Sequence, residues 1–301
     1  MPYKIFAGSS HPTLAKTLVR ALGVPLGKIT LSTFSCGEKY VRINEDIHNK
    51  EVFILQTCRD QMTNEDLMEL FLMCAAAKQA SASKIHVIIP HFAYARQDKM
   101  FKNGEPISAK LMADLIAKSG ANHVITFQLH SEQVRKCFSV PIDELTMEKA
   151  FADHFKKKRI KKLVIVAPDA GAAKMANRLA HQLGAETATI YKTRLAPNQS
   201  KVLSIKGNVK GKTCIIYDDM VDTGGTVVNA KKALLDHGAN KDVYLCATHG
   251  ILSGHAIKRL KQAKFKEVML TDTLPMSKDK NFKGLLTTSV VKAIKGQIFS
   301  S

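Results

Sequence analysis

Three aspartates and two glycines close to residue 220 form the cluster of this chain with the clearest chemical meaning. Residues 214–226 read CIIYDDMVDTGGT, an apolar run followed by Asp218, Asp219 and Asp222 and then by a Thr-Gly-Gly-Thr turn. In an α/β sheet, ligands bind at the carboxyl ends of the strands. Adjacent glycines let the backbone approach a phosphate, and a helix that begins there offers free N–H groups and the positive end of its dipole. We therefore expect the turn to bind a phosphate.

The three carboxylates upstream of the turn require a different ligand, because they would repel a phosphate. Carboxylate oxygens accept hydrogen bonds from sugar hydroxyls, and they also bind metal ions. The segment therefore fits a phosphorylated sugar, with its phosphate in the turn and its hydroxyls on the aspartates.

Two further segments carry cations at the ends of apolar runs. Arg96 and Gln97 follow residues 85–90, and their side chains suit phosphate oxygens and a base or ribose, respectively. Lys192 and Arg194 are two residues apart, so in an extended chain they project to one face, where they could neutralise charge on a reacting phosphate. Taken alone, both segments also fit solvated surface loops.

The elements that position these residues follow from the hydrophobic pattern. Runs such as IHVIIP, LVIVAP and CIIY are apolar on both faces, which is typical of a parallel sheet covered by helices on both sides. The pattern recurs in both halves and predicts two similar, doubly wound α/β domains. We expect strands over residues 3–7, 29–34, 51–56, 85–90, 123–129, 163–167, 187–191, 214–217, 243–247 and 267–270. We expect helices over residues 12–22, 64–80, 107–118, 147–158, 172–183, 226–237 and 254–263.

A turn signal at residues 141–146 divides the two patterns. We place the first domain at residues 1–145 and the second at 146–301. Residues 40–46, YVRINED, alternate apolar and charged side chains and predict a solvated edge hairpin.

Composition limits the class of protein and its partners. The chain has 301 residues and a formal net charge of +19, which favours a polyanionic partner, either nucleic acid or nucleotide phosphates. The basic run at 156–162 lies between a helix and a buried strand, where lysines are favourable beside the helix dipole, so we expect no nucleic-acid partner. Six scattered cysteines without a CxxC argue against a zinc ribbon and a thioredoxin-type redox motif, and they fit reduced thiols. The start lacks an apolar signal core and no run approaches about 20 apolar residues, so we expect a cytoplasmic protein with no membrane partner.

The ordered motifs of the chain resemble those of the ribose-phosphate pyrophosphokinases, also called phosphoribosyl-pyrophosphate synthetases. DDMVDTGGT resembles the ribose-phosphate motif that this family shares with type I phosphoribosyltransferases. The resemblance extends over nearly the whole chain, through FAGSSHPTLA (6–15), FSCGE (34–38), LMELFLMCAAAKQASASKI (67–85), HFAYARQDK (91–99), PISAKL (106–111), ITFQLHSEQ (125–133), VAPDAGAAK (166–174) and ATHGILSG (247–254).

The resemblance implies a fold and a reaction. The fold would be two phosphoribosyltransferase-like domains, with ATP-binding segments in the first and the ribose 5-phosphate site and catalytic loop in the second. The enzyme would transfer the diphosphoryl group of ATP to the anomeric hydroxyl of ribose 5-phosphate, with Mg²⁺ required, and would release phosphoribosyl pyrophosphate and AMP. The family also implies a homo-oligomer, built from dimers and commonly a hexamer.

The resemblance assigns roles residue by residue. Lys192 and Arg194 would be catalytic, and His130 and Asp169 would bind the metal ion. The ATP-binding residues would be Phe34, Cys36, Gly37, Glu38, Arg96 and Gln97. The ribose 5-phosphate-binding residues would be Arg194, Asp218, Asp219, Asp222, Thr223, Gly224, Gly225 and Thr226.

Two alternatives remain open at this point. One is a phosphoribosyltransferase, which would consume the same sugar phosphate. The other is a catalytically impaired regulatory homologue, because Cys36, Gln128 and Ala172 stand where the family usually has Asp or Asn, Asp, and Gly.

Overall fold

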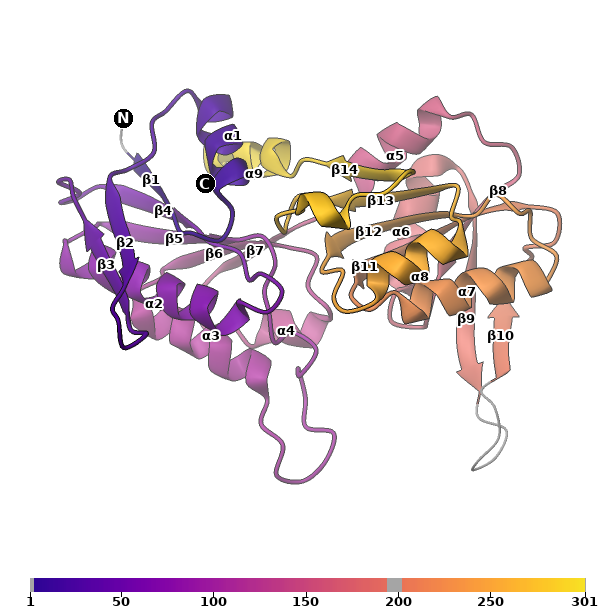
Figure 1. Ribbon diagram of the computed structural model, residues 1–301, viewed down its shortest axis with the longest axis horizontal. Coiled ribbons are helices and arrows are strands. Elements are labelled where there is room, and N and C mark those ends of the chain that lie inside the picture. Colours follow the sequence, from indigo (N-terminus) through magenta and orange to yellow (C-terminus); the bar gives the residue numbers. More distant parts are fainter. Residues whose placement is uncertain (1–2, 194–201, 301) are drawn as a thin grey trace. The chain divides into compact units, whose positions relative to one another are not determined.

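The computed structural model describes residues 3–193 and 202–300, without the side chains of 192, 193, 202, 203 and 300. The chain forms two compact units (Figure 1). Unit 1 consists of Met1–Leu145, Thr273–Pro275 and Ser289–Ser301, and unit 2 of Thr146–Asp272 and Met276–Thr288. The second unit is therefore shorter than the expected 146–301, because two later segments belong to the first unit. Among the described residues, no helix combines the length and the apolarity that a membrane crossing needs.

Unit 1 contains a five-stranded parallel sheet with the order β1-β4-β5-β6-β7. Its central strands are buried on both faces, as the sequence predicts for a covered parallel sheet. The strands are β1 (Tyr3–Ala7), β4 (Glu51–Leu55), β5 (Lys84–Ile89), β6 (His123–Phe127) and β7 (Ile142–Leu145).

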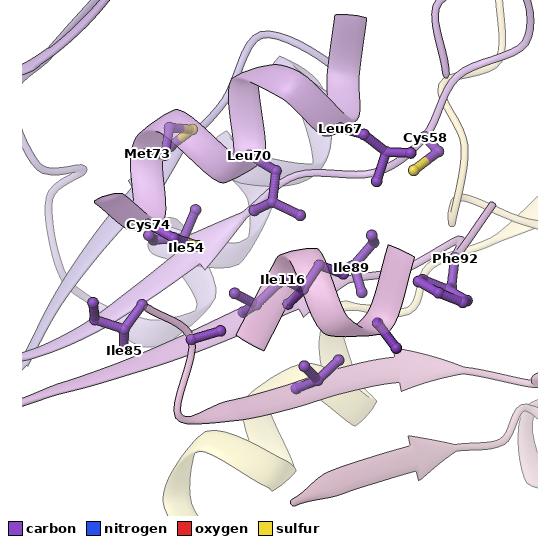
Figure 2. Close-up of a cluster of buried hydrophobic side chains, with 14 of the residues drawn as sticks. Ile54, Cys58, Leu67, Leu70, Met73, Cys74, Ile85, Ile89, Phe92 and Ile116 are labelled. Atoms are coloured by element: carbon purple, nitrogen blue, oxygen red, sulfur yellow. The ribbon is translucent and has the colours of Figure 1, made fainter. Parts of the chain in front are cut away.

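Helices cover both faces of this sheet (Figure 1). Helices α1 and α9 pack together on one face, and α2 and α3 pack together on the other. The helices are α1 (Pro12–Leu22), α2 (Thr63–Gln79), α3 (Ser108–Ser119), α4 (Glu132–Lys136) and α9 (Val291–Ser300). Figure 2 shows the core beneath α2 and α3, where Leu67, Leu70 and Met73 of α2 and Ile116 of α3 meet Ile54, Ile85 and Ile89 of the strands.

A separate two-stranded hairpin packs on the same core. Its strands, β2 (Ile29–Thr33) and β3 (Lys39–Ile43), are antiparallel, and alternate residues on each strand, such as Leu31 and Val41, pack against the buried cluster. The hairpin expected near residues 40–46 is therefore present, but it is half-buried and not fully solvated. Its apolar side chains pack against the core of unit 1.

Unit 2 contains a seven-stranded sheet with the order β10-β9-β8-β11-β12-β13-β14. All pairs are parallel except β9 with β10. The strands are β8 (Leu163–Ala167), β9 (Glu186–Thr193), β10 (Val202–Lys206), β11 (Thr213–Val221), β12 (Tyr244–Gly250), β13 (Glu267–Thr271) and β14 (Leu285–Thr288).

Both faces of this second sheet are also covered. On one face Val227 and Leu234 pack with the strands, and on the other Phe151 and Phe155 meet Tyr217 and Tyr244 edge to face, at ring centroid distances of 5.6 and 5.7 Å. Two similar doubly wound domains are thus confirmed as the fold. The helical elements are α5 (Glu148–Lys157), α6 (Ala173–Leu183), α7 (Gly225–Asp236), α8 (Ala256–Ala263) and the short 3₁₀ turn η1 (Lys278–Lys280).

A chain of hydrogen-bonded polar groups, of which His86 and His123 are buried, joins three strands of unit 1 to its last helix. His86 Nδ1 lies 2.9 Å from His123 Nδ1, and His123 Nε2 lies 2.8 Å from Asp143 Oδ2, which also accepts a hydrogen bond from Gln297 at 2.6 Å. Phe53 stacks on the His86 ring with centroids 4.4 Å apart. Burial, helped by the nearby charge of Lys84, lowers the pKa of His86 to about 4.

We predict that protonation of His86 in the unfolded chain destabilises the folded protein at acidic pH. Above its usual pKa of 6.5, His86 is neutral in both folded and unfolded chains; between 6.5 and about 4, only the unfolded chain binds the proton. The free energy of unfolding should therefore fall by about 2 kcal/mol between pH 7 and pH 5 from this group alone. Urea denaturation at the two pH values should show that the free energy of unfolding falls less in His86→Gln than in the unsubstituted protein.

The matched control for this experiment is His48→Gln, which replaces an exposed histidine of the same unit. It should leave the pH dependence as it is. An equal pH dependence in His86→Gln and in the unsubstituted protein would contradict the prediction.

Candidate active site

The aspartate and glycine segment lies where the sequence predicts it, at the carboxyl end of β11. The strand continues to Val221, and helix α7 begins at Gly225. Gly224 precedes the helix with φ +76°, a left-handed conformation that favours glycine. A sharp turn from strand to helix results.

The turn presents backbone donors that the protein does not use. Within the part of the chain that the structure describes, the N–H groups of Gly225, Thr226 and Val227 have no protein acceptor, and no side chain caps the helix. A Cβ added to Gly225 would meet nothing closer than Thr223 Oγ1 at 3.8 Å. Free amides at a helix N-terminus form a binding site for an anion such as phosphate.

The loop after β12 and the helix that follows it, α8, support this turn. Ser253 Oγ donates to Asp222 Oδ1, the Ser253 N–H donates to the Asp222 carbonyl at 3.2 Å, and Arg259 Nη1 donates to the Thr223 carbonyl at 2.8 Å. Asp222 is half-buried and Thr223 is exposed. Neither Ser253 nor Arg259 is predicted from the sequence as a site residue, although Ser253 lies in the motif ATHGILSG.

Three carboxylates converge at the ends of two adjacent strands of unit 2. Burial raises the pKa of the Asp218 carboxyl well above its usual value, and the negative charges of Asp219 and Asp169 raise it further. Asp169 follows β8, which pairs with β11. A cation or a set of hydroxyl donors would relieve the mutual repulsion of these groups.

The turn after β8 holds Asp169 by a backbone hydrogen bond. Its Oδ1 accepts from the Ala172 N–H at 3.2 Å, just before α6. Ala172 has φ −80° and a buried methyl group, so alanine is accommodated there without backbone strain. A Cβ at Gly171 would come within 3.2 Å of Asp169 Oδ1, so glycine suits that position.

The ATP-binding segment expected at residues 34–38 forms the turn of the β2–β3 hairpin. The Phe34 N–H donates to the Glu38 carbonyl and the Gly37 N–H donates to the Phe34 carbonyl, both at 2.8 Å. Gly37 has φ +95°, which the tight turn requires. Phe34, Cys36 and Glu38 are all exposed, so their side chains are accessible to a ligand.

Three further predicted residues lie in the loops after β5 and β6. Gln97 Oε1 accepts a hydrogen bond from Ser108 Oγ, while the Arg96 side chain is exposed. Ser131 Oγ donates to Asp98 Oδ2, so the loop that carries Arg96 and Gln97 touches the residue after His130. These loops adjoin because the carboxyl ends of β5 and β6 meet at one edge of the sheet.

The remaining predictions fall partly outside the described residues. The backbone of Lys192 belongs to β9 and pairs with that of Leu203. The side chain of Lys192 and the whole of Arg194 lie outside the described part of the chain. His130 belongs to unit 1 and Asp169 to unit 2. In residues 3–193 and 202–300, no three His, Cys, Asp or Glu side chains form a group able to hold a metal ion.

Comparisons with known proteins match both units. Residues 3–120 match the family model described as the N-terminal domain of ribose phosphate pyrophosphokinase, and residues 141–276 match the phosphoribosyl transferase domain. A ribose-phosphate pyrophosphokinase of Caldanaerobacter subterraneus is 45% identical over 289 residues, which cover 95% of this chain and 90% of the relative. The Bacillus subtilis protein of the same description is 41% identical over 287 residues, with 95% and 90% covered.

A solved structure matches over the full length of the chain. The crystal structure of phosphoribosylpyrophosphate synthetase from Mycobacterium smegmatis has a TM-score of 0.93 and 37% sequence identity, and the match covers 100% of this chain and 98% of that one.

We predict different effects on stability when the two glycines of the turn are replaced. Gly224→Ala should lower the free energy of unfolding by about 1–2 kcal/mol, because a side chain at φ +76° is strained. Gly225→Ala should not lower it, because the added Cβ has room and alanine favours the helix. Urea denaturation of both variants checks this, and equal losses would contradict the geometry of the turn.

Proposed function

Because the chain belongs to the ribose-phosphate pyrophosphokinase family, we infer that it transfers the diphosphoryl group of ATP to the anomeric hydroxyl of ribose 5-phosphate, forming phosphoribosyl pyrophosphate and AMP. The observation that carries this conclusion is the similarity of both units, in order, to one family. Such similarity is not expected of a phosphoribosyltransferase, because residues 3–120 of unit 1 match the N-terminal domain of the pyrophosphokinases.

We propose that unit 2 binds ribose 5-phosphate at the β11–α7 turn. The free N–H groups of Gly225 and Thr226 would bind its 5-phosphate, with Thr223 and Gly224 completing the turn. The carboxylates of Asp218, Asp219 and Asp222 would accept hydrogen bonds from the ribose hydroxyls. The separation of amide donors and carboxylate acceptors along one segment supports this placement, since each suits one end of the sugar phosphate.

We propose that unit 1 binds ATP. The exposed ring of Phe34 would stack on adenine, and the Glu38 carboxylate would accept a hydrogen bond from the amino group of adenine. Cys36 and Gly37 form the turn between Phe34 and Glu38. Arg96 would bind phosphate oxygens, and Gln97, fixed by Ser108, would bind the base or ribose.

Mg²⁺ fits the donor set in part. Asp169 offers a carboxylate that is held by one backbone hydrogen bond and lies close enough to Asp218 to raise the pKa of that carboxyl, and Mg²⁺ commonly combines one or two carboxylates with substrate phosphates. His130 is the second proposed ligand. When bound, the ion would neutralise charge on the diphosphate.

The protein's own contribution to the reaction is positioning and charge stabilisation. The anomeric oxygen of ribose 5-phosphate forms a bond to the β-phosphorus of ATP as the bond from that phosphorus to the AMP oxygen breaks, and the hydroxyl proton is released. The aspartates hold the sugar, and Lys192 and Arg194 are proposed to stabilise the negative charge that develops on the transferred group.

Other features of the chain support a small-molecule enzyme with identical subunits. The basic run at 156–162 is explained without nucleic acid, since its first lysines end α5 and Lys158 pairs with Glu267 at 2.7 Å. Ile107, Leu111 and Leu115 expose an apolar stripe at the start of α3 and along it, which supports association of identical subunits. Dimers that assemble into hexamers are proposed. Location in the cytoplasm, where both substrates occur, is also proposed.

The test of the function is AMP formation from ATP. We expect AMP only when ribose 5-phosphate and Mg²⁺ are both present, and chelation of the metal should abolish it. Absence of AMP in a folded protein that still binds ATP would instead identify an impaired regulatory homologue. Gly225→Ala should raise the KM for ribose 5-phosphate without changing ATP binding in the absence of sugar, which tests the proposed location of the sugar phosphate.

We predict that Lys192 acts mainly in the transition state. Lys192→Ala should lower kcat about 10²–10³-fold, the typical cost of losing one such stabiliser, while ATP binding stays within a few-fold. Steady-state kinetics and ATP titration on one preparation check this. Lys206→Ala, which replaces an exposed lysine on β10, is the matched control and should keep kcat. Normal kcat in Lys192→Ala would mean that another group, with Arg96 the first candidate, stabilises the charge.

A further inference from the structure

The outward face of the β2–β3 hairpin carries two aromatic rings in contact. The rings of Phe34 and Tyr40 lie edge to face, with centroids 5.6 Å apart and planes at 70°. Phe34 is 53% exposed and Tyr40 36% exposed, so neither ring is part of the buried core. Edge-to-face contact at this distance is a favourable aromatic geometry.

The register of the hairpin produces this contact. Tyr40 pairs with Ser32 and Lys39 with Thr33, and the Phe34 N–H donates to the Glu38 carbonyl. Successive side chains of a strand alternate between faces. Tyr40 and Arg42 are therefore outward and exposed, whereas Lys39 and Val41 are inward and half-buried.

The backbone beneath the two rings is anchored from the opposite face. Lys39 Nζ lies 3.3 Å from Glu69 Oε2, and Glu69 is only 3% exposed. The same carboxylate accepts from the Ser9 N–H at 2.6 Å and from Gln56 Nε2 at 2.9 Å. The strand that carries Tyr40 is therefore held on its inward face.

We propose that Tyr40 is a positioning residue that holds the Phe34 ring in the orientation in which it stacks on the adenine of ATP. The inference rests on the proposed ATP site. An exposed ring that rotates freely loses that freedom when a base stacks on it, and this loss weakens binding. Contact with Tyr40 removes part of that freedom before ATP arrives.

The proposal predicts an effect confined to ligands that carry a base. Tyr40→Val removes the ring and replaces it with another residue that favours β-strands. It should raise the Kd for ATP about 3–10-fold, which is the fold-change that corresponds to the interaction free energy measured for aromatic pairs. Inorganic tripolyphosphate, which has no base, should inhibit with an unchanged Ki, and the KM for ribose 5-phosphate and kcat at saturating ATP should stay near those of the unsubstituted protein.

Three variants complete the experiment. Tyr40→Phe keeps the ring and should bind ATP within twofold of the unsubstituted protein. Ser32→Ala, at the residue paired with Tyr40, is the matched control and should have no effect. Phe34→Ala reports on the proposed site itself and should weaken ATP binding at least as much as Tyr40→Val.

The outcomes separate the two claims. If Phe34→Ala weakens ATP binding and Tyr40→Val does not, Tyr40 has no positioning role, although the ATP site stands. If Tyr40→Val weakens the binding of tripolyphosphate as much as the binding of ATP, the Tyr40 ring only supports the structure of the hairpin, and the proposal is wrong. If Phe34→Ala leaves ATP binding unchanged, the proposed ATP site itself fails.

Discussion

Two mainly parallel sheets, each covered on both faces, set the constraint on which the arrangement of the molecule depends. A parallel strand cannot return through a tight turn, so each connection crosses a face of the sheet and brings the next strand in at the same edge. The loops that leave the carboxyl ends therefore gather at one edge in each unit. For this reason Asp169 and Asp218, about 50 residues apart in sequence, affect each other electrostatically, and Asp98 meets Ser131.

The central elements could be predicted from the sequence because their burial leaves a strong pattern. The bounds expected for β1, α1 and β8 are those observed. The strands that the sequence did not predict, β7, β10 and β14, are all at sheet edges. An edge strand has one neighbour and one open side, so it tolerates charges such as Asp143 and Glu144 and loses the continuous apolar run. Helix α9 was also missed, although the spacing of Val291, Ile294 and Ile298 is a helical signal that could have revealed it.

Part of the candidate site could be predicted from the sequence, for a chemical reason. Glycines and carboxylates that act on one ligand adjoin in residues 218–226, so their types and order alone indicate a sugar phosphate. The groups that support them could not be found in this way, since Ser253 and Arg259 lie more than 30 residues further on and meet the turn only through the fold. Tyr40 likewise reads as an alternating strand residue, and its relation to Phe34 appears only when the register of the hairpin is known.

The return of the last helix to unit 1 has a consequence for synthesis of the chain. Helix α9 packs against α1, Lys295 Nζ donates to the Ala21 carbonyl at 2.6 Å, and Gln297 reaches Asp143. During translation, the sheet of unit 1 is complete once Leu145 has left the ribosome, but the helix that helps to cover one of its faces emerges about 150 residues later. At ordinary elongation rates of about 5–20 residues per second, that face stays partly open for roughly 10–30 seconds. The nascent chain therefore offers chaperones a defined apolar surface on its first unit throughout synthesis of the second.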